Sequence, residues 1–552
     1  MNKTNRMPDL VYTPIDGASR EPGGYTSANA GSAKPEATVE LASETAVRRA
    51  TVKTADAYTA RSPRTLLDVV GLPSVMALLF LTGRAQAQCN GGLRELSTDP
   101  FTNSTSQHRT EVEPDTFAFG STIVAALQVG RFFDGGASDI GWATSTDGGT
   151  TWSNGLLSGI TKFQGSGPYD RVSDPSVAYD ARHDVWLISS LALREVGGSN
   201  PPVAPAVVVS RSRDGGLTWA NPAVVATGRD LDKNWTVCDT TATSPFYGNC
   251  YTQYDDVSTG DQLRMTTSTD GGLTWSEAAV PSMGAAGGQP VVQRNGTVIV
   301  PLGDAYLSSV RAVTSTDGGL SYAGPVTIAP ILAHPVAGNL RSPPLPSAEI
   351  DGAGRVYVVW QDCRFRSGCA SNDIVMSTSS NGTAWSPVVR IPIDDTTSAV
   401  DHFIPGLAVD KATAGSSAHL GLTYYYYPQA NCSTSTCQLD VGFISSSNGG
   451  ASWSTPMQLA GPMSLGWLAR TNQGAMVADY ISTSFASGAA HGVFALAHAP
   501  SGGCGGSLLD EAVYTTRAGL VASGGKVTSS GERAVVSAGE ARFATRAPVT
   551  IR

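Results

Sequence analysis

Short apolar runs of strand length recur along the chain, and glycine-rich turns separate them. Tyr357-Val-Val-Trp360 and Asp373-Ile-Val-Met376 are two such runs, one on each side of a loop. Runs of this length, rich in β-branched and aromatic residues, predict strands. Hydrophobic residues make up 41% of the 552 residues and charged residues only 15%, with 61 glycines, which is typical of a turn-rich all-β protein.

A glycine-rich turn motif repeats along the chain. The sequence Ser145-Thr-Asp147-Gly-Gly149-Thr-Thr-Trp152 recurs three times with little change, and two degenerate copies end in Trp385 and Trp453. In such a turn, called an Asp box below, Asp or Asn accepts hydrogen bonds from the turn's own amides and glycine supplies the positive φ. We therefore interpret the repeated residue as structural rather than catalytic at Asp147, Asp214, Asp270, Asp317 and Asn448.

The spacing of the boxes predicts an all-β fold of the β-propeller type. Their aromatic residues lie 47 to 68 residues apart, about one propeller blade with its loops. The segments that open the units favour seven blades, with six as the alternative; they begin near Glu113, Ser173, Cys238, Gln289, Pro346, Ile404 and Gly474. We expect residues 90–104 to supply the outer strand of the last unit and Glu511–Tyr514 its third strand. The propeller would span residues 88–510, and residues 511–552 would form the last strand and a weakly structured tail.

The first 87 residues are expected to lie outside the propeller. Residues 1–60 have no sustained apolar period and are predicted to be disordered. Residues 61–87 combine a basic start, the apolar stretch Val69–Thr82 and the tripeptide Ala85-Gln86-Ala87, the pattern of a secretory signal peptide. An over-extended start site explains its distance from the first residue, with a membrane-anchored form as the alternative. The first explanation predicts a secreted protein with no membrane segment in its mature form.

Eight cysteines, an even number, agree with an oxidising compartment. Three pairs are close in sequence, so we expect the local disulfides Cys238–Cys250, Cys363–Cys369 and Cys432–Cys437. Cys89 and Cys504 stand at the two ends of the repeat region, which a ring would bring together, and are expected to pair. No cysteine or histidine spacing is typical of a zinc site. The sequence thus predicts no metal and no cofactor, with structural calcium as an open alternative.

The candidate chemistry lies where the first strands of the blades converge on a central channel. Polar residues at these strands are Glu113, Asp115, Asp174, Gln289, Glu349 and Asp479, and those in adjacent loops are Arg131, Asp134, Arg364, Arg366 and Tyr480. Crowded carboxylates raise one another's pKa values, which suits acid/base catalysis. The alternative is that these residues only hydrate the channel or cap strand ends.

The Asp boxes and the order of the units resemble the sialidase superfamily, including bacterial BNR-repeat proteins, over about residues 105–500. The resemblance implies an arginine triad that binds the substrate carboxylate, an Asp acid/base, and a Tyr nucleophile activated by Glu. On this chain it implies catalytic roles for Asp134, Glu349 and Tyr480, with Asp139 as a rival to Asp134. It implies substrate binding by the set Arg131, Arg364, Arg366, Glu113, Asp174 and Asp479.

The chain departs from the family at its first strand. Sialidases open with an Arg-Ile-Pro motif that supplies the first arginine of the triad, whereas this chain reads Thr110-Glu-Val-Glu113-Pro114. A buried carboxylate facing a substrate carboxylate is unfavourable, which favours a neutral or cationic glycan over sialic acid.

Charge and resemblance together define the expected function. The net charge of −9 argues against nucleic acid or an anionic membrane surface as a partner. We expect a secreted, monomeric glycoside hydrolase, exo-α-sialidase-like, that acts on an extracellular glycan. The alternatives are a non-catalytic propeller that binds glycans or proteins at the cell surface, and a polysaccharide lyase or endo-glycanase on the same scaffold.

Overall fold

Residues 92–197, 200–500, 509–524 and 527–528 are described by a computed structural model. All of them belong to one structural unit. The predicted disordered extension, the signal peptide and the Cys89–Cys504 pair lie outside the described residues. Within these residues, no helix has the length and apolar character needed to cross a membrane.

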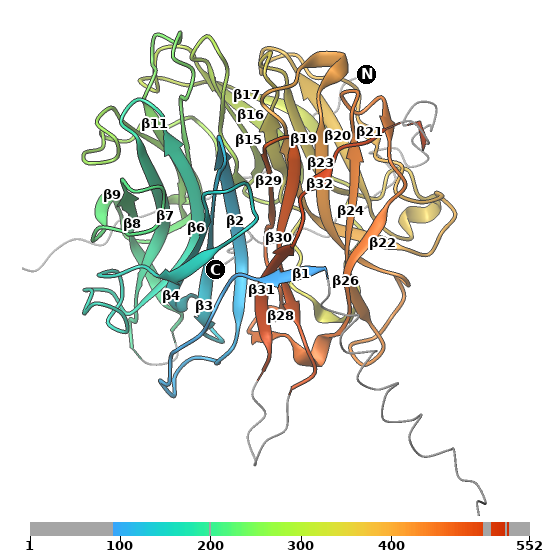
Figure 1. The fold of residues 1–552 in the computed structure, drawn as a ribbon, viewed down its shortest axis with the longest axis horizontal. Helices are drawn as coiled ribbons and strands as arrows, with labels where there is room; N and C mark the ends of the chain where they lie inside the picture. The colour runs from blue at the N-terminus through green and yellow to red at the C-terminus, as the bar shows by residue number, and fades with distance from the viewer. Residues whose placement is uncertain (1–91, 198–199, 501–508, 525–526, 529–552) are drawn as a thin grey trace, which may run out of the picture. The chain divides into compact units, whose positions relative to one another are not determined.

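The described residues form an all-β structure of antiparallel strands, drawn in Figure 1. The first sheet contains β2 (Glu111–Phe119), β3 (Thr122–Arg131), β4 (Ala137–Ser145), β5 (Ser153–Leu156), β6 (Arg171–Asp180), β7 (Val185–Arg194), β8 (Val203–Ser212) and β9 (Ala223–Thr227). A single residue pair, Ala137 with Val172, joins its two four-stranded groups, β2–β5 and β6–β9.

The next sheets follow in chain order. One contains β10 (Leu231–Cys238), β11 (Cys250–Asp256) and β12 (Gln262–Ser268), and another β13 (Ala285–Gly288), β14 (Val291–Val292), β15 (Val298–Asp304), β16 (Ser309–Ser315) and β17 (Ala323–Pro330). They are followed by β18 (Ser347–Ile350), β19 (Val356–Asp362), β20 (Asp373–Ser379) and β21 (Val389–Arg390), and by β22 (Asp401–Val409), β23 (Leu420–Tyr427), β24 (Gln438–Ser446) and β26 (Met457–Ser464).

The last sheet combines both ends of the described chain. It contains β29 (Ser482–Ala486), β30 (Ala489–Ala497), β31 (Glu511–Thr516), β32 (Leu520–Val521) and the first strand, β1 (Leu93–Glu95). Leu93 pairs with Thr516, so the expected outer strand from residues 90–104 and the expected third strand at Glu511–Tyr514 are both confirmed.

Two small sheets and five 3-10 helices complete the described residues. The sheets are β25 (Ser452–Trp453) with β33 (Val527–Thr528), and β27 (Ala469–Thr471) with β28 (Gly474–Met476). The helices are η1 (Val257–Thr259), η2 (Ala337–Asn339), η3 (Ser367–Cys369), η4 (Gly415–Ser417) and η5 (Leu465–Trp467).

Neighbouring sheets bury one another, which explains the continuous apolar runs. Strand β3, with the sequence TIVAALQVGR, is buried along almost its whole length. Val124 and Ile140 of the first group pack against Val177 and Ile188 of the second in one core cluster. A strand covered on both faces loses the alternation of polar and apolar residues that a half-exposed strand shows.

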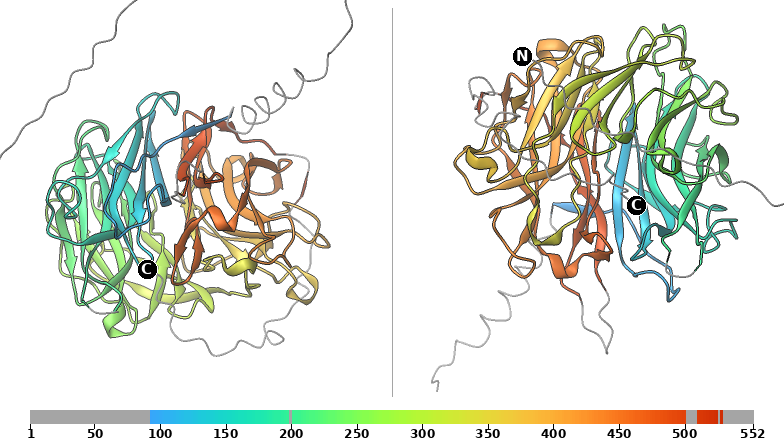
Figure 2. Two further views of the ribbon diagram at one scale, coloured as in Figure 1. Left: turned by 90° about the horizontal axis from the view of Figure 1, so that it is seen from below. Right: turned by 180° about the vertical axis from the view of Figure 1, so that it is seen from behind.

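The first strands of consecutive groups also contact one another. Strand β2 packs against β6, β6 against β10, β10 against β13 and β14, β14 against β18, β18 against β22, β22 against β29, and β29 against β2. These first strands therefore follow one another around a common centre, which the view from below in Figure 2 shows.

The three predicted local disulfides are confirmed. Cys238–Cys250 joins neighbouring residues of β10 and β11, while Cys363–Cys369 and Cys432–Cys437 close loops after β19 and β23.

Each Asp box follows the third strand of its group. Asp147 accepts hydrogen bonds from the Thr151 amide (2.8 Å) and hydroxyl (2.6 Å), and the Trp152 indole donates to the Gly149 carbonyl (3.0 Å). Hydrogen bonds from Thr151 lower the pKa of Asp147 to about 2. Corresponding turn hydrogen bonds recur at Asp214, Asp270, Asp317 and Asn448.

Candidate functional site at the centre of the sheets

A β-bulge interrupts several of the first strands and places polar side chains at the centre. The pairing register shifts between Val112 and Asp115 in β2, and similar shifts occur in β6 and β10. The bulged residues Glu113, Asp174 and Lys233 have φ values of 52°, 49° and 50°. Non-glycine residues rarely adopt positive φ, so these positions store backbone strain. Proline follows Glu113 and Asp174, and a bulge tolerates proline because no ladder hydrogen bond is needed there.

The bulged residues meet in a buried charge cluster. Lys233 Nζ lies 2.9 Å from Asp479 Oδ2 and 3.2 Å from Asp174 Oδ2. Arg341 grips the Asp479 carboxylate with two hydrogen bonds, Nε to Oδ1 at 2.6 Å and Nη2 to Oδ2 at 2.5 Å. Glu113 accepts a hydrogen bond from the Asp479 amide at 3.3 Å and another from the Gln128 side chain. The structure thus brings together the predicted residues Glu113, Asp174 and Asp479.

Burial and charge act in opposite directions within this cluster. Burial alone would raise the pKa of Asp479, but the charges of Arg341 and Lys233 outweigh it and lower that pKa. Burial also raises the pKa of Glu113, to about 8, and the carboxylates of Asp479 and Asp174 add to the effect. Two cations therefore hold Asp479 as a carboxylate, while Glu113 favours its protonated form.

The hairpin β27–β28 packs beside this cluster at the end where the first strands begin. The Arg341 amide donates to the Ala475 carbonyl at 2.8 Å, and the Arg131 guanidinium donates to the Met476 sulfur at 3.2 Å. Met476 also packs against Val112. Arg131 is fully buried, and burial is the main reason that its pKa falls to about 10.

Tyr480, next to Asp479 in the sequence, contacts the charge cluster through Lys233, whose ammonium group lies 6.0 Å from the centre of its ring. Its ring packs edge-on against Trp235, with centroids 5.1 Å apart, and its hydroxyl donates to the Pro175 carbonyl at 3.1 Å. Burial raises the pKa of Tyr480 well above its usual range, and the surrounding carboxylates raise it further. A phenolate nucleophile is therefore disfavoured in this arrangement.

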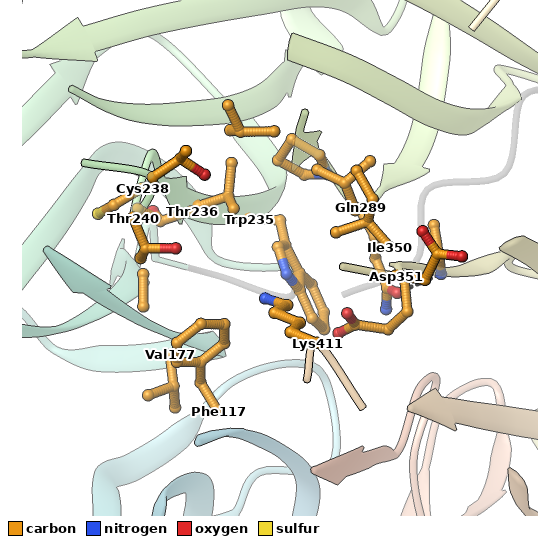
Figure 3. A pocket seen from close by; sticks show the side chains of 18 of the residues that line it. Phe117, Val177, Trp235, Thr236, Cys238, Thr240, Gln289, Ile350, Asp351 and Lys411 are labelled. Carbon is orange, nitrogen blue, oxygen red and sulfur yellow. Dashed lines mark hydrogen bonds between the residues drawn. The ribbon is translucent and has the colours of Figure 1, made fainter. Parts of the chain in front are cut away.

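A cavity of about 420 Å³ opens beyond Trp235, towards the far ends of the first strands (Figure 3). Trp235 and Lys411 project into the space that separates Phe117 and Val177 from Gln289. The carboxylates of Asp115 and Glu349 also line the cavity, whose rim includes the exposed residues Ala242 and Thr243.

The two cavity carboxylates have raised pKa values. Burial is the main cause for Asp115, and Glu349 adds to it, whereas a 2.7 Å hydrogen bond from the Val177 amide opposes it; the pKa reaches about 7. Burial also raises the pKa of Glu349, while the nearby Lys411 charge lowers it. Two carboxyl groups in one cavity, with different surroundings and so different pKa values, are typical of general acid/base catalysis.

Asp134 lies far from this cavity. Strand β3 pairs Val124 with Phe117 at the cavity, and it ends seven residues later at Arg131, about 23 Å away at 3.3 Å per residue. Asp134 follows in the next loop, where its carboxylate is 41% exposed and lies 2.5 Å from the Arg171 guanidinium. Asp134, Glu349 and Tyr480 therefore do not form one site in this structure.

The rival to Asp134, Asp139, is also away from the cavity. It is buried on β4. Burial raises its pKa well above the usual range, so its neutral form is favoured.

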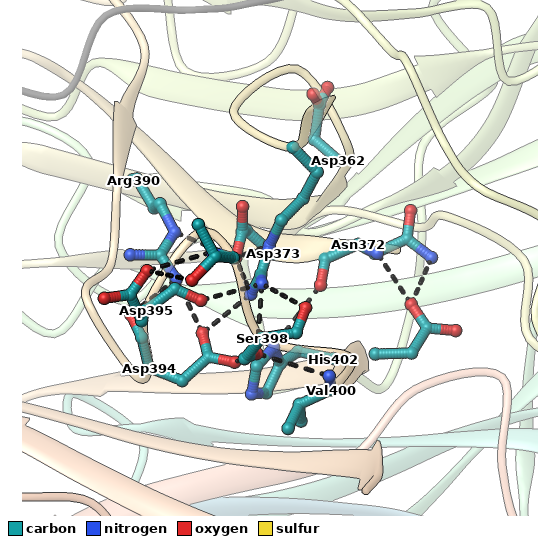
Figure 4. A network of polar contacts seen from close by, with 12 residues as sticks. Asp362, Asn372, Asp373, Arg390, Asp394, Asp395, Ser398, Val400 and His402 are labelled. Carbon is teal, nitrogen blue, oxygen red and sulfur yellow. Dashed lines mark hydrogen bonds and ion pairs between the residues drawn. The ribbon is translucent and has the colours of Figure 1, made fainter. Parts of the chain in front are cut away.

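The two predicted loop arginines are both committed to ion pairs. Arg364 binds Asp362 on its own loop, with Nη2 2.7 Å from Oδ2. Arg366 lies 2.5 Å from Asp373 and 2.6 Å from Asp394. Both aspartates belong to the buried polar network shown in Figure 4. Neither of them lines the cavity.

The same network contains a geometric candidate for a metal site. One oxygen each of Asp373 and Asp394 and one nitrogen of His402 lie within 4.8 Å of one another. Arg366 and Arg390 already neutralise both carboxylates, with Arg390 2.9 Å from Asp373 and 2.6 Å from Asp394. The two carboxylates therefore already have guanidinium partners in the places that a metal ion would take.

Sequence reasoning missed Lys233, Arg341, Trp235 and Lys411. Lys233 occupies in β10 the bulge position that Glu113 and Asp174 occupy in β2 and β6, but no proline follows it, so the sequence does not mark this bulge. Arg341 and Lys411 lie on loops outside any repeated pattern.

Comparisons with known proteins confirm the resemblance to sialidases. No family model matches the chain. A sialidase from Micromonospora viridifaciens is 28% identical over 267 residues, which cover 45% of this chain and 40% of that protein. The chain thus spans less than half the length of this relative.

Two solved structures illustrate the structural comparison. A protein of unknown function from Dyadobacter fermentans is 17% identical with a TM-score of 0.41, covering 64% of this chain and 99% of that one. The Trypanosoma rangeli sialidase in complex with sialic acid is 14% identical with a TM-score of 0.40, covering 61% of this chain and 56% of that one.

Proposed function

We propose that this chain is a secreted glycoside hydrolase, built on a seven-bladed β-propeller, that cleaves an extracellular glycan in the cavity lined by Asp115 and Glu349. The proposal rests above all on these two carboxyl groups in one hollow with the aromatic wall of Trp235. The sialidase relative supports glycan chemistry. The three disulfides support export, because such bonds persist in oxidising compartments.

The order of contacts between first strands supports the proposed count of seven blades. Going round the centre, β2, β6, β10, β13 with β14, β18, β22 and β29 each contact the next, and β29 returns to β2. Each position in this circuit corresponds to one blade. Strand β1, which pairs with β31, supplies the outer strand of the last blade.

The two carboxyl groups take different roles. Asp115, with a pKa of about 7, acts as general acid and donates its proton to the glycosidic oxygen as the bond to the anomeric carbon breaks. Glu349, whose ionised form the Lys411 charge favours, accepts a proton from the water that attacks this carbon. One water is added across the bond, and the two carboxyl groups exchange protonation states, which solvent then restores.

The cavity suits a neutral sugar better than an acidic one. Among its charged lining residues, three are carboxylates (Asp115, Glu349 and Asp351) and two are cations (Arg294 and Lys411). The predicted arginines Arg131, Arg364 and Arg366 do not line it, and Arg364 and Arg366 are held in ion pairs elsewhere. With Asp115 protonated as the general acid, the two other carboxylates balance the two cations, so the cavity has no excess of positive charge to bind a substrate carboxylate. This agrees with Glu113 standing where sialidases have arginine.

The direct test measures hydrolysis of fluorogenic aryl glycosides by the protein and three variants. The substrates include aryl glycosides of neutral sugars and one sialoside. Glu349→Gln and Asp115→Asn should each lower the turnover rate about 10²–10⁴-fold, the range for removing a general acid or base. Asp134→Asn, the matched acidic control, should change it less than about threefold. If the protein releases the fluorophore from the sialoside, and Asp134→Asn abolishes this release while Glu349→Gln preserves it, the active site lies at the loop after β3 instead.

The binding-only alternative would gain support from an exposed run of aromatic residues at the mouth of the channel. The tyrosine run of β23 does not provide it, because Tyr424, Tyr425 and Tyr427 are buried in the core. Binding of a neutral glycan without any hydrolysis would nevertheless favour this alternative over the enzyme.

A further inference from the structure

A second hollow, of about 350 Å³, adjoins the cavity that contains Asp115. Four residues line both hollows, namely Phe117, Thr240, Glu349 and Lys411. Both volumes fall within or close to the roughly 300–1,000 Å³ typical of small-molecule sites. Glu349 therefore stands at the junction of two spaces, each large enough to hold part of a ligand.

The walls of the second hollow combine aromatic rings with hydroxyl groups. Phe117 and Phe119 come from the end of β2 and Phe485 from β29, while Ser484 and Ser487 offer hydroxyls. The Phe119 side chain is 43% exposed, so its ring is available to a ligand. Tyr179 holds this ring from behind, with centroids 4.5 Å apart. Flat apolar surfaces beside hydroxyls suit sugar rings, which present C–H faces and hydroxyl edges.

Lys411 separates the two spaces without closing them. Its ammonium group lies 4.5 Å from the centre of the Phe117 ring, and its charge acts on Glu349. The side chain as a whole is exposed at the start of the loop after β22. A chain that passes from one hollow to the other would run alongside Lys411 and across Glu349.

We propose that the two hollows form one continuous cleft for a neutral oligosaccharide chain, with sugar units on both sides of Glu349, so that the bond cleaved is internal to the chain. This inference rests on the hydrolase function proposed above, because it places the cleaved bond at Glu349. It makes the second hollow a binding site for the sugars on one side of that bond. The ligand class is a polysaccharide or long oligosaccharide rather than a single terminal sugar.

The test measures how affinity depends on chain length. Glu349→Gln, expected to bind without cleaving, is titrated with two-unit and five-unit oligosaccharides of glucose, xylose, arabinose and N-acetylglucosamine. In at least one series the five-unit chain should bind ten or more times more tightly than the two-unit chain. Adding Phe119→Ala should reduce this ratio to below about three, and Phe485→Ala, on a different strand, provides a second variant if the first does not fold.

The matched control is Phe133→Ala. Phe133 is 56% exposed, like Phe119, but it lies in the loop after β3 and lines neither hollow. This variant should keep the ratio of affinities. Equal affinity for short and long chains in every series, no binding in any series, or equal effects of the Phe119 and Phe133 substitutions would overturn the inference.

Different results would contradict the hydrolase proposal and the proposal of a continuous cleft. If the protein shows length-dependent binding that needs Phe119 but cleaves none of the oligosaccharides, the cleft stands as a binding site and the catalytic proposal is wrong. If it cleaves two-unit and five-unit chains equally well, with equal affinity, the catalytic proposal stands and the cleft is wrong.

Discussion

The buried charge cluster predicts a large loss of stability when Asp479 loses its charge. Asp479→Asn preserves the size of the side chain but leaves Lys233 and Arg341 without the carboxylate that both contact, at 2.9 Å and at 2.6 and 2.5 Å. Both cations are almost fully buried, so water cannot replace the lost partner. Removing one member of a buried ion pair costs about 3–5 kcal/mol of the free energy of unfolding.

The control for this experiment is Asp134→Asn. Asp134 also lies 2.5 Å from an arginine, but its carboxylate is 41% exposed, and pairs of this kind contribute about 0–1 kcal/mol. Urea titration of the parent protein and the two variants gives the loss in the free energy of unfolding that each substitution causes. A difference between the variants of less than about 1 kcal/mol would refute the reasoning that the cluster holds the centre together by charge.

The pH dependence of stability offers a second measure of the same residue. The pKa of Asp479 is below its ordinary 3.8 in the folded protein, so its charge stabilises the fold above that pH and the contribution is lost as the pH falls further. The Asp479→Asn variant should therefore lose less stability than the parent on acidification below about pH 4.

Three further predictions concern single features. The pKa of Glu113 is raised from 4.5 to about 8, so protonated Glu113 contributes stability that is fully present below pH 4.5 and is lost as the pH rises through 8. Glu113→Gln should therefore show a smaller decline in the free energy of unfolding between about pH 4.5 and 8, measured by urea titration. Replacing both Cys238 and Cys250 by alanine should lower the free energy of unfolding by about 2–4 kcal/mol relative to the oxidised parent, with both proteins titrated under non-reducing conditions. Asp214→Ala should cost about 1–2 kcal/mol by the same assay, because the turn amide of Thr218 loses its acceptor; an unchanged urea midpoint would contradict this.

Features set by local chemistry could be predicted from the sequence. An Asp-box turn needs only its own residues, as the hydrogen bonds between Asp147 and Thr151 illustrate. The disulfides of close cysteine pairs depend on loops that bring the two ends together whatever the rest of the fold does. The outer strand at Leu93 could be predicted because the last unit lacked one.

The sequence predicted three members of the charge cluster, Glu113, Asp174 and Asp479, but not their cationic partners Lys233 and Arg341. Lys233 was missed because a bulge decides where its side chain points. A bulge adds one residue to a strand and turns its side chain out of the regular alternation. The residues at the bulges in β2, β6 and β10 are a Glu, an Asp and a Lys, so no single residue type marks the position. Opposite charges at equivalent positions become partners only once the strands are arranged around one centre.

The separation of Asp134 from Glu349 follows from strand direction. Asp134 lies beyond the end of the second strand of its group, whereas Glu349 lies near the end of the first strand of another. In an antiparallel group, the end of the first strand is beside the beginning of the second, as the pairing of Glu349 with Tyr357 shows. The end of the first strand and the end of the second strand therefore lie at opposite edges of every group. This topology argues against one active site that contains both Asp134 and Glu349.

The division of the centre into two parts has a physical reason. The charge cluster is stable only while it excludes water, because its ion pairs gain their strength from burial. A hydrolase needs the opposite, since water is its second substrate and must reach the reacting carbon. The bulges direct Glu113, Asp174 and Lys233 into the closed part, whereas Asp115, two residues after Glu113 on the same strand, lines the open one. One strand can therefore serve both purposes: its bulge fixes the position of the strand at the centre, and the residues beyond it are presented to the cavity.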